Sequence, residues 1–65
     1  MSTRIVNLEY RGAFIGEVVI SHKEWQDYPA TIPQPAIDRI FEAFSDDEDW
    51  DGDIDFAQVR LTAFH

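Results

Sequence analysis

The chain has 65 residues, contains no cysteine and carries a formal charge of -8. This length allows a single small domain, and the lack of cysteine excludes disulfide bonds and thiolate metal sites. The acidity argues against direct binding to nucleic acid or to an anionic membrane, because those partners attract clustered Lys and Arg.

Two stretches, residues 3–10 and 13–20, alternate apolar and polar residues and predict an antiparallel hairpin. The residues between them, Arg11-Gly12, allow a tight turn because glycine readily adopts positive φ. Gly16 interrupts the second stretch and predicts a weak point, a bulge or a place where another group packs closely. The inward face of the hairpin is expected to consist of Val6, Leu8, Tyr10, Phe14, Val18 and Ile20.

Two helices are expected next. Ser21 and Glu24 form a capping-box pattern, which predicts a short helix that ends before Pro29. A second start of the same kind at Thr31 predicts the main helix, which runs to residue 44. The apolar stripe of this helix, expected to be buried on the sheet, is Ile37, Ile40, Phe41 and Phe44. Truncation of Phe41 to Ala should then cost about 3–5 kcal/mol.

Residues 54–64 alternate again and predict a third strand paired with the hairpin. A helix over residues 56–64 is the alternative, because some apolar residues there also fit helical spacing. The inward residues of the strand would be Ala57, Val59, Leu61 and Ala63. The predicted fold is therefore a single α+β domain over residues 1–65, in which a small three-stranded antiparallel β-sheet is covered by one main α-helix plus a short helix.

Residues 46–55 hold seven of the thirteen carboxylates and no cation. The other six carboxylates are nearly balanced by five Lys and Arg, so the chain is a near-neutral domain with one negative patch. Keeping like charges together costs free energy through self-repulsion. The pattern therefore indicates a bound cation or a cationic partner, or, as the simplest alternative, a solvated loop that keeps the protein soluble.

If residues 51–55 are extended, alternate Asp side chains point the same way about 6.5–7 Å apart, which is similar to the phosphate spacing along a nucleic-acid strand. Trp50 lies within the run, either tucked into the edge of the core or serving as an interface anchor. The candidate partner-binding residues are Asp46, Asp47, Glu48, Asp49, Trp50, Asp51, Asp53 and Asp55.

Catalysis is not predicted. The two histidines, His22 and His65, stand in no nucleophile motif. A solvated run of carboxylates also offers no enclosed pair for acid-base chemistry. We therefore expect a binding protein that uses no cofactor.

Calcium binding is the main alternative, because residues 47–58 match the spacing of an EF-hand loop. The match starts at Asp47 and includes Gly52 for the sharp turn. Gln58, at the last position, cannot supply the bidentate carboxylate that completes the calcium shell, and the chain has no second hand to pair with. No metal site is assigned for these reasons.

A very small, cysteine-free and highly acidic α+β chain of this kind resembles the phage-encoded anti-CRISPR proteins, in particular inhibitors of type I surveillance complexes and, among these, of type I-C. The resemblance covers the whole chain in size and charge, and rests on no sequence motif. It implies a DNA mimic that occupies the positively charged surface with which a Cas subunit reads the PAM duplex. The carboxylates of residues 46–55 would stand in for phosphates and meet Lys and Arg.

Such an inhibitor is expected to be a monomer in the cytoplasm of the bacterial host, and to act by protein-protein interaction. No stretch is long and apolar enough for a signal peptide or a membrane span, so we expect neither. A small phage structural or assembly protein with an incidental acidic face is a third hypothesis.

Overall fold

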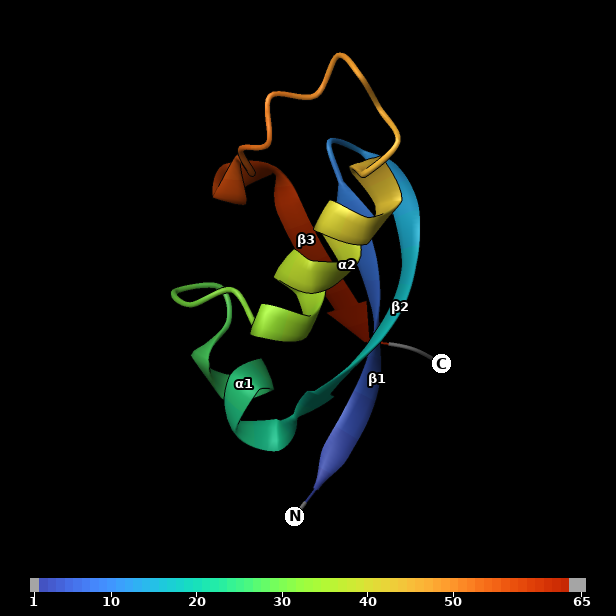
Figure 1. The fold of residues 1–65 in the computed structure, drawn as a ribbon. Helices are drawn as coiled ribbons and strands as arrows, with labels where there is room; N and C mark the ends of the chain where they lie inside the picture. Colours follow the sequence, from blue (N-terminus) through green and yellow to red (C-terminus); the bar gives the residue numbers. More distant parts are fainter. Residues whose placement is uncertain (1, 64–65) are drawn as a thin grey trace.

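A three-stranded antiparallel sheet in the order β2-β1-β3 forms one layer of the structure, a computed structural model that describes residues 2–63. Both helices lie on one face of this sheet (Figure 1), and neither is long and apolar enough to cross a membrane. The predicted α+β class is confirmed. The elements are β1 (Thr3–Tyr10), β2 (Ala13–Ser21), α1 (His22–Asp27), α2 (Gln34–Phe44), the 3-10 turn η1 (Phe56–Gln58) and β3 (Val59–Ala63).

The core fills the space between the sheet and α2, and the central strand β1 contributes alternate residues to it. The opposite face of the sheet is open. There Ile5 and Val19, paired across β1 and β2, are both exposed. The buried apolar residues of the core are Val6, Leu8, Tyr10, Val18, Ile20, Ala36, Ile40, Val59 and Leu61.

A β-bulge in β2 places Phe14 on the opposite face from the one predicted. Leu8 pairs with Gly16, but Glu9 pairs with Phe14, so Ile15 is an extra residue in β2. Because side chains alternate between the two faces of a strand, one extra residue inverts the pattern beyond it. Phe14 therefore points to the open face, where it is 63% exposed.

Gly16 accounts for the position of the bulge. Its φ of +154° is a backbone conformation that residues with a Cβ rarely adopt. A Cβ at this position would also lie 3.1 Å from Nη2 of Arg39, which comes from α2. The sequence-based prediction of a bulge or a close approach at Gly16 is therefore confirmed in both of these forms, because the glycine permits the bulge and leaves room for the guanidinium group.

Helix α2 buries a stripe that differs from the predicted one. Ala36 and Ile40 are fully buried, and Ile37 and Phe44 are half-buried. Phe41 is 43% exposed, so the prediction that it lies in the core is wrong. Because Ala36 is small, the helix can approach the sheet closely there, and the line of contact runs through Ala36 and Ile40. Phe41 falls at the edge of this line and packs against the loop that follows the helix.

Helix α1 forms as predicted. The Ser21 hydroxyl accepts a hydrogen bond from the Glu24 amide at 3.1 Å, and the Glu24 carboxylate accepts one from the Ser21 amide at 2.8 Å. The helix ends at Asp27, before Pro29. The capping box therefore gives hydrogen-bond partners to two amides at the start of the helix, those of Ser21 and Glu24, and fixes where β2 ends.

Helix α2 starts at Gln34, with Pro33 as its N-cap and no side-chain cap, and not at Thr31 as predicted. A start at Thr31 would put Pro35 where the first intrahelical N–H group must donate a hydrogen bond, and proline has no such group. With Pro33 as the N-cap, Pro35 lies in the first turn, where the backbone N–H would have no helical partner anyway.

The third strand starts later than the predicted strand over residues 54–64. Asp55 instead forms two hydrogen bonds with residues just after it in the chain. Its side chain accepts one from the Ala57 amide at 3.1 Å, and its carbonyl oxygen accepts one from the Gln58 amide at 2.9 Å. Side-chain to backbone hydrogen bonds of this kind compete with the strand ladder. They turn the chain into η1 before β3 begins.

The predicted alternation of buried and exposed side chains over residues 57–63 is confirmed at its centre and wrong at both ends. Val59 and Leu61 are buried against the core, as predicted. Ala57 is exposed because it lies in η1, and Ala63 is exposed at the last residue of an edge strand. Phe64 lies outside the described residues.

The burial of α2 gives a paired test of the core. Replacing Ile40 with Ala should lower the free energy of unfolding by about 2–5 kcal/mol, because it leaves a cavity between α2 and the sheet. Phe41→Ala should lower it by less, since part of that ring is already in water. Urea unfolding of the two variants measures both effects. A larger loss for Phe41→Ala than for Ile40→Ala would contradict this description of the core.

Candidate functional site

The acidic loop, residues 46–55, arches over one end of the molecule, from the end of α2 to η1 (Figure 1). The turn between β1 and β2 lies at the same end. All seven carboxylates of the loop are exposed. The structure therefore gathers the candidate partner-binding carboxylates on a single loop. One end of this loop is attached to α2 and the other leads into η1 and β3.

Trp50 fixes the middle of the acidic loop to α2. Its ring lies 5.2 Å from that of Phe41 and 5.9 Å from that of Phe44, measured between ring centroids. Its indole Nε1 donates a hydrogen bond to the backbone oxygen of Asp53 at 3.1 Å. Trp50 therefore lies at the edge of the core, where its half-buried side chain supports the loop, and its role as an interface anchor stays a prediction.

Tyr10 fixes the end of the acidic loop to the sheet. It is the last residue of β1 and is buried, with its ring packed edge-on against Phe44 at 5.7 Å. Its hydroxyl accepts a hydrogen bond from the Asp55 amide at 3.0 Å. The neighbouring Ile54 is half-buried against the core. The loop thus has an apolar anchor and a polar anchor at the point where it leaves the charged region.

The acidic loop contains tight turns on both sides of Trp50. The side chain of Asp47 accepts a hydrogen bond from the Asp49 amide, and that of Asp51 accepts one from the Asp53 amide, each at 3.0 Å. Gly52 has a φ of +88°, which bends the chain at this point. Residues 51–55 are therefore not extended, and the regular spacing of alternate carboxylates that an extended chain would give is absent.

The charge of the acidic loop is not neutralised from within the described part of the chain. Residues 2–63 contain two ion pairs within 4.0 Å, Lys23 with Asp27 and Arg39 with Glu42, and both lie on helices outside the loop. Arg11 lies beside the loop, with its guanidinium over the Tyr10 ring at 5.4 Å. A hollow of about 260 Å³ separates loop and hairpin turn, lined by Tyr10, Arg11, Phe44, Asp47, Asp49, Trp50 and Asp51.

The EF-hand spacing is not accompanied by EF-hand geometry. The matching segment ends in the 3-10 turn η1 and is followed by strand β3, whereas an EF-hand loop is followed by a helix. Across residues 2–63 no three side chains of His, Asp or Glu come close enough together to hold a metal ion. The calcium hypothesis therefore rests on sequence spacing alone.

His22, one of the two histidines of the chain, is exposed at the first position of α1. Its Nε2 lies 3.0 Å from the side-chain nitrogen of Gln26. The acidic loop lies beyond the far end of α2, so the structure does not bring this histidine to the carboxylates (Figure 1). His65 lies outside the described residues.

The chain matches no protein-family model, no curated protein and no solved structure. Its site is therefore interpreted from its own residues. Two supports of that site were missed by the sequence analysis. Tyr10 was predicted only to face inward, and no pattern indicated its bond to Asp55, which lies 45 residues away. Phe41 was assigned to the core, although its position next to the acidic run could have suggested a contact with Trp50.

The hydrogen bond between Tyr10 and Asp55 predicts both a small loss of stability and a local change in amide hydrogen exchange, and the two can be measured separately. Tyr10→Phe keeps the ring but removes the acceptor, so it should lower the free energy of unfolding by about 0.5–1.5 kcal/mol. Amide hydrogen exchange at Asp55 should become faster. Tyr28→Phe is a matched control, because the Tyr28 hydroxyl accepts from the Leu61 amide in β3 at 3.0 Å. That variant should speed exchange at Leu61 and leave Asp55 unchanged; the same exchange pattern in both variants would contradict the assignment.

The geometry of the acidic loop also predicts its response to divalent cations. Millimolar calcium and magnesium should raise the melting temperature slightly and equally, because both screen the repulsion between the carboxylates. Calorimetric titration should show no saturable site. A one-site calcium isotherm that Asp47→Ala and Asp51→Ala abolish, and that magnesium does not reproduce, would instead support an EF-hand-like site.

Proposed function

We propose that the chain is a binding protein that uses the acidic loop to occupy a positively charged, nucleic-acid-binding surface of another protein. Occupation of that surface would keep nucleic acid away from it. The observation that carries the proposal is the set of seven exposed carboxylates that have no cationic partner within 4.0 Å among the described residues. A cationic partner would supply the opposite charge that the fold itself does not.

The anchoring of the acidic loop supports binding over a purely solubilising role. A loop that serves only solubility needs no fixed shape, whereas this one is held at Trp50 and Asp55 by aromatic packing and by hydrogen bonds. Fixed carboxylates lose less conformational entropy when a partner binds them than mobile ones do. An anchored acidic surface is therefore suited to recognition.

Mimicry of nucleic acid by this loop would depend on charge density and not on the spacing of a strand. Because the loop turns at Gly52, its carboxylates are clustered at one end of the molecule. Such a cluster can pair with several Lys and Arg side chains at once, as phosphates do. The resemblance in size and charge to anti-CRISPR proteins suggests the partner: the PAM-reading surface of a type I surveillance complex, with type I-C as the first choice.

Reversal of three carboxylates tests the role of the acidic loop. The triple variant Asp49→Lys, Asp51→Lys and Asp53→Lys should keep the domain folded, because all three side chains are exposed and the only hydrogen bond lost among the described residues is the local one from the Asp53 amide to the Asp51 side chain. It should no longer block the binding of nucleic acid to the partner. Binding of the parent chain should be fast and weakened by salt, since charge attraction steers the encounter. The matched control makes the same change of charge outside the loop, by reversal of the exposed residues Glu17, Asp27 and Asp38.

The measurement is a gel-shift competition with a purified type I-C surveillance complex and a labelled target duplex, in both orders of addition. The parent and the control triple should block duplex binding when added first, and bound duplex should slow entry of the inhibitor. The loop triple should not block it. A stable ternary species, or a loop triple that inhibits as well as the control triple, would refute mimicry by this loop. Failure of the parent chain to bind the complex would refute the named partner.

A further inference from the structure

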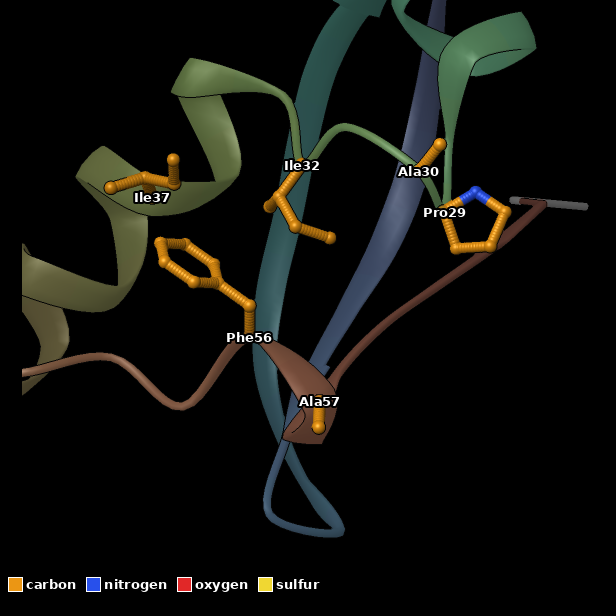
Figure 2. A pocket seen from close by; sticks show the side chains of 6 residues that line it. All are labelled: Pro29, Ala30, Ile32, Ile37, Phe56 and Ala57. Atoms are coloured by element: carbon orange, nitrogen blue, oxygen red, sulfur yellow. The ribbon is translucent and has the colours of Figure 1, made fainter.

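A second surface beside the acidic loop is apolar. A hollow of about 450 Å³ lies between η1, the start of α2 and the segment that joins α1 to α2. In Figure 2 the Phe56 ring points toward Ile32 and Ile37, and Ala57 lies next to it on η1. No charged or polar side chain lines this hollow, whose lining residues are Pro29, Ala30, Ile32, Ile37, Phe56 and Ala57.

Phe56 is exposed on a segment that is held in place. The residue is 52% exposed, although the 3-10 turn that carries it is capped by the Asp55 side chain. The Asp55 amide in turn donates to the buried Tyr10 hydroxyl. Because the backbone on the N-terminal side of Phe56 is fixed in this way, the open hollow is a property of the folded chain. An exposed apolar hollow of this kind is a common feature of interaction sites.

The hollow is continuous with the acidic loop. Asp55 is both the last carboxylate of the loop and the cap of η1, so Phe56 follows the charged region directly. Residues 46–58 contain no Lys or Arg, and Arg11 lines the hollow on the hairpin side of the loop and not the hollow at Phe56. A basic surface that approaches from the Phe56 side therefore meets no like charge among the residues that line that hollow. Protein interfaces commonly combine a desolvated apolar anchor with a charged surround. The hollow and the acidic loop together have this composition.

We propose that the hollow receives an aliphatic or aromatic side chain that lies beside the cationic surface of the same partner protein. This inference rests on the proposed function and adds a second contact to it. The carboxylates bring the basic surface to the loop, and the apolar contact at Phe56 then slows dissociation. The two contacts control different rates, because long-range charge attraction governs association while desolvated short-range packing governs dissociation.

Two variants test the hollow. Phe56→Ala removes one wall, and Ala30→Gln places an uncharged polar side chain into the hollow from an exposed position. Phe14→Ala is the matched control, since it truncates an exposed phenylalanine on the open face of the sheet. Melting temperatures of all three should stay close to that of the parent, because none of these side chains is buried.

The measurement is binding kinetics on the immobilised type I-C surveillance complex. Phe56→Ala and Ala30→Gln should dissociate at least about tenfold faster than the parent, with unchanged association rate and salt dependence. Phe14→Ala should behave as the parent does. A photo-crosslinking phenylalanine analogue at position 56 should crosslink to the complex, whereas the same analogue at position 14 should not.

The outcomes separate this inference from the proposed function. If the loop triple loses binding while Phe56→Ala dissociates like the parent, the hollow lies outside the contact and only the inference fails. If Phe56→Ala weakens binding while the loop triple binds normally, the occupant does not lie beside a cationic surface and both proposals fail. Absence of binding by the parent refutes the named partner and overturns this inference with it. A dimer of the parent in sedimentation equilibrium that Phe56→Ala dissociates would assign the hollow to a second copy of this chain, and would overturn the inference.

Discussion

The placement of the acidic loop depends on Tyr10, a buried residue at the end of the central strand. Its ring packs on Phe44, which contacts Trp50, and its hydroxyl accepts from the Asp55 amide. One side chain therefore connects both the middle and the end of the loop to the core. Apolar burial and these hydrogen bonds offset the mutual repulsion of the carboxylates, which would otherwise spread the loop away from the domain.

Two arginines outside the acidic loop, Arg4 and Arg39, are engaged in other contacts. Arg4 lies over the Trp25 ring at 5.2 Å, and Arg39 packs against the bulge at Gly16 while it approaches Glu42 at 3.8 Å. The acidic loop, with its seven exposed carboxylates, lies at one end of the molecule (Figure 1), and Arg11 in the hairpin turn is a cation at the same end. The cluster of carboxylates creates a negative field that extends beyond the surface and would steer a basic partner of the proposed kind toward the loop. The apolar hollow at Phe56 would then offer such a partner a contact that does not depend on charge.

Most of the secondary structure followed from the sequence, because it depends on residues close together in the chain. Alternation predicted the hairpin, the pair Ser21 and Glu24 predicted the start of α1, and apolar spacing predicted α2 as far as Phe44. The exposure of the seven carboxylates also followed, since a segment with seven acids in ten residues contains almost nothing that a core could bury. These are properties of composition and local periodicity, which do not require knowledge of the packed chain.

Tertiary structure decided which faces those elements present and what shape the acidic loop takes. The bulge that turns Phe14 outward requires Gly16 to face Arg39 of a helix that comes later in the chain. The loop is not extended because Trp50 must reach α2 while the Asp55 amide reaches a hydroxyl 45 residues away. Such contacts leave no periodic signal in the sequence, because they depend on where separate elements meet once the core has formed. The amino-acid sequence by itself therefore determined the charge of the acidic loop, whereas tertiary packing determined its shape.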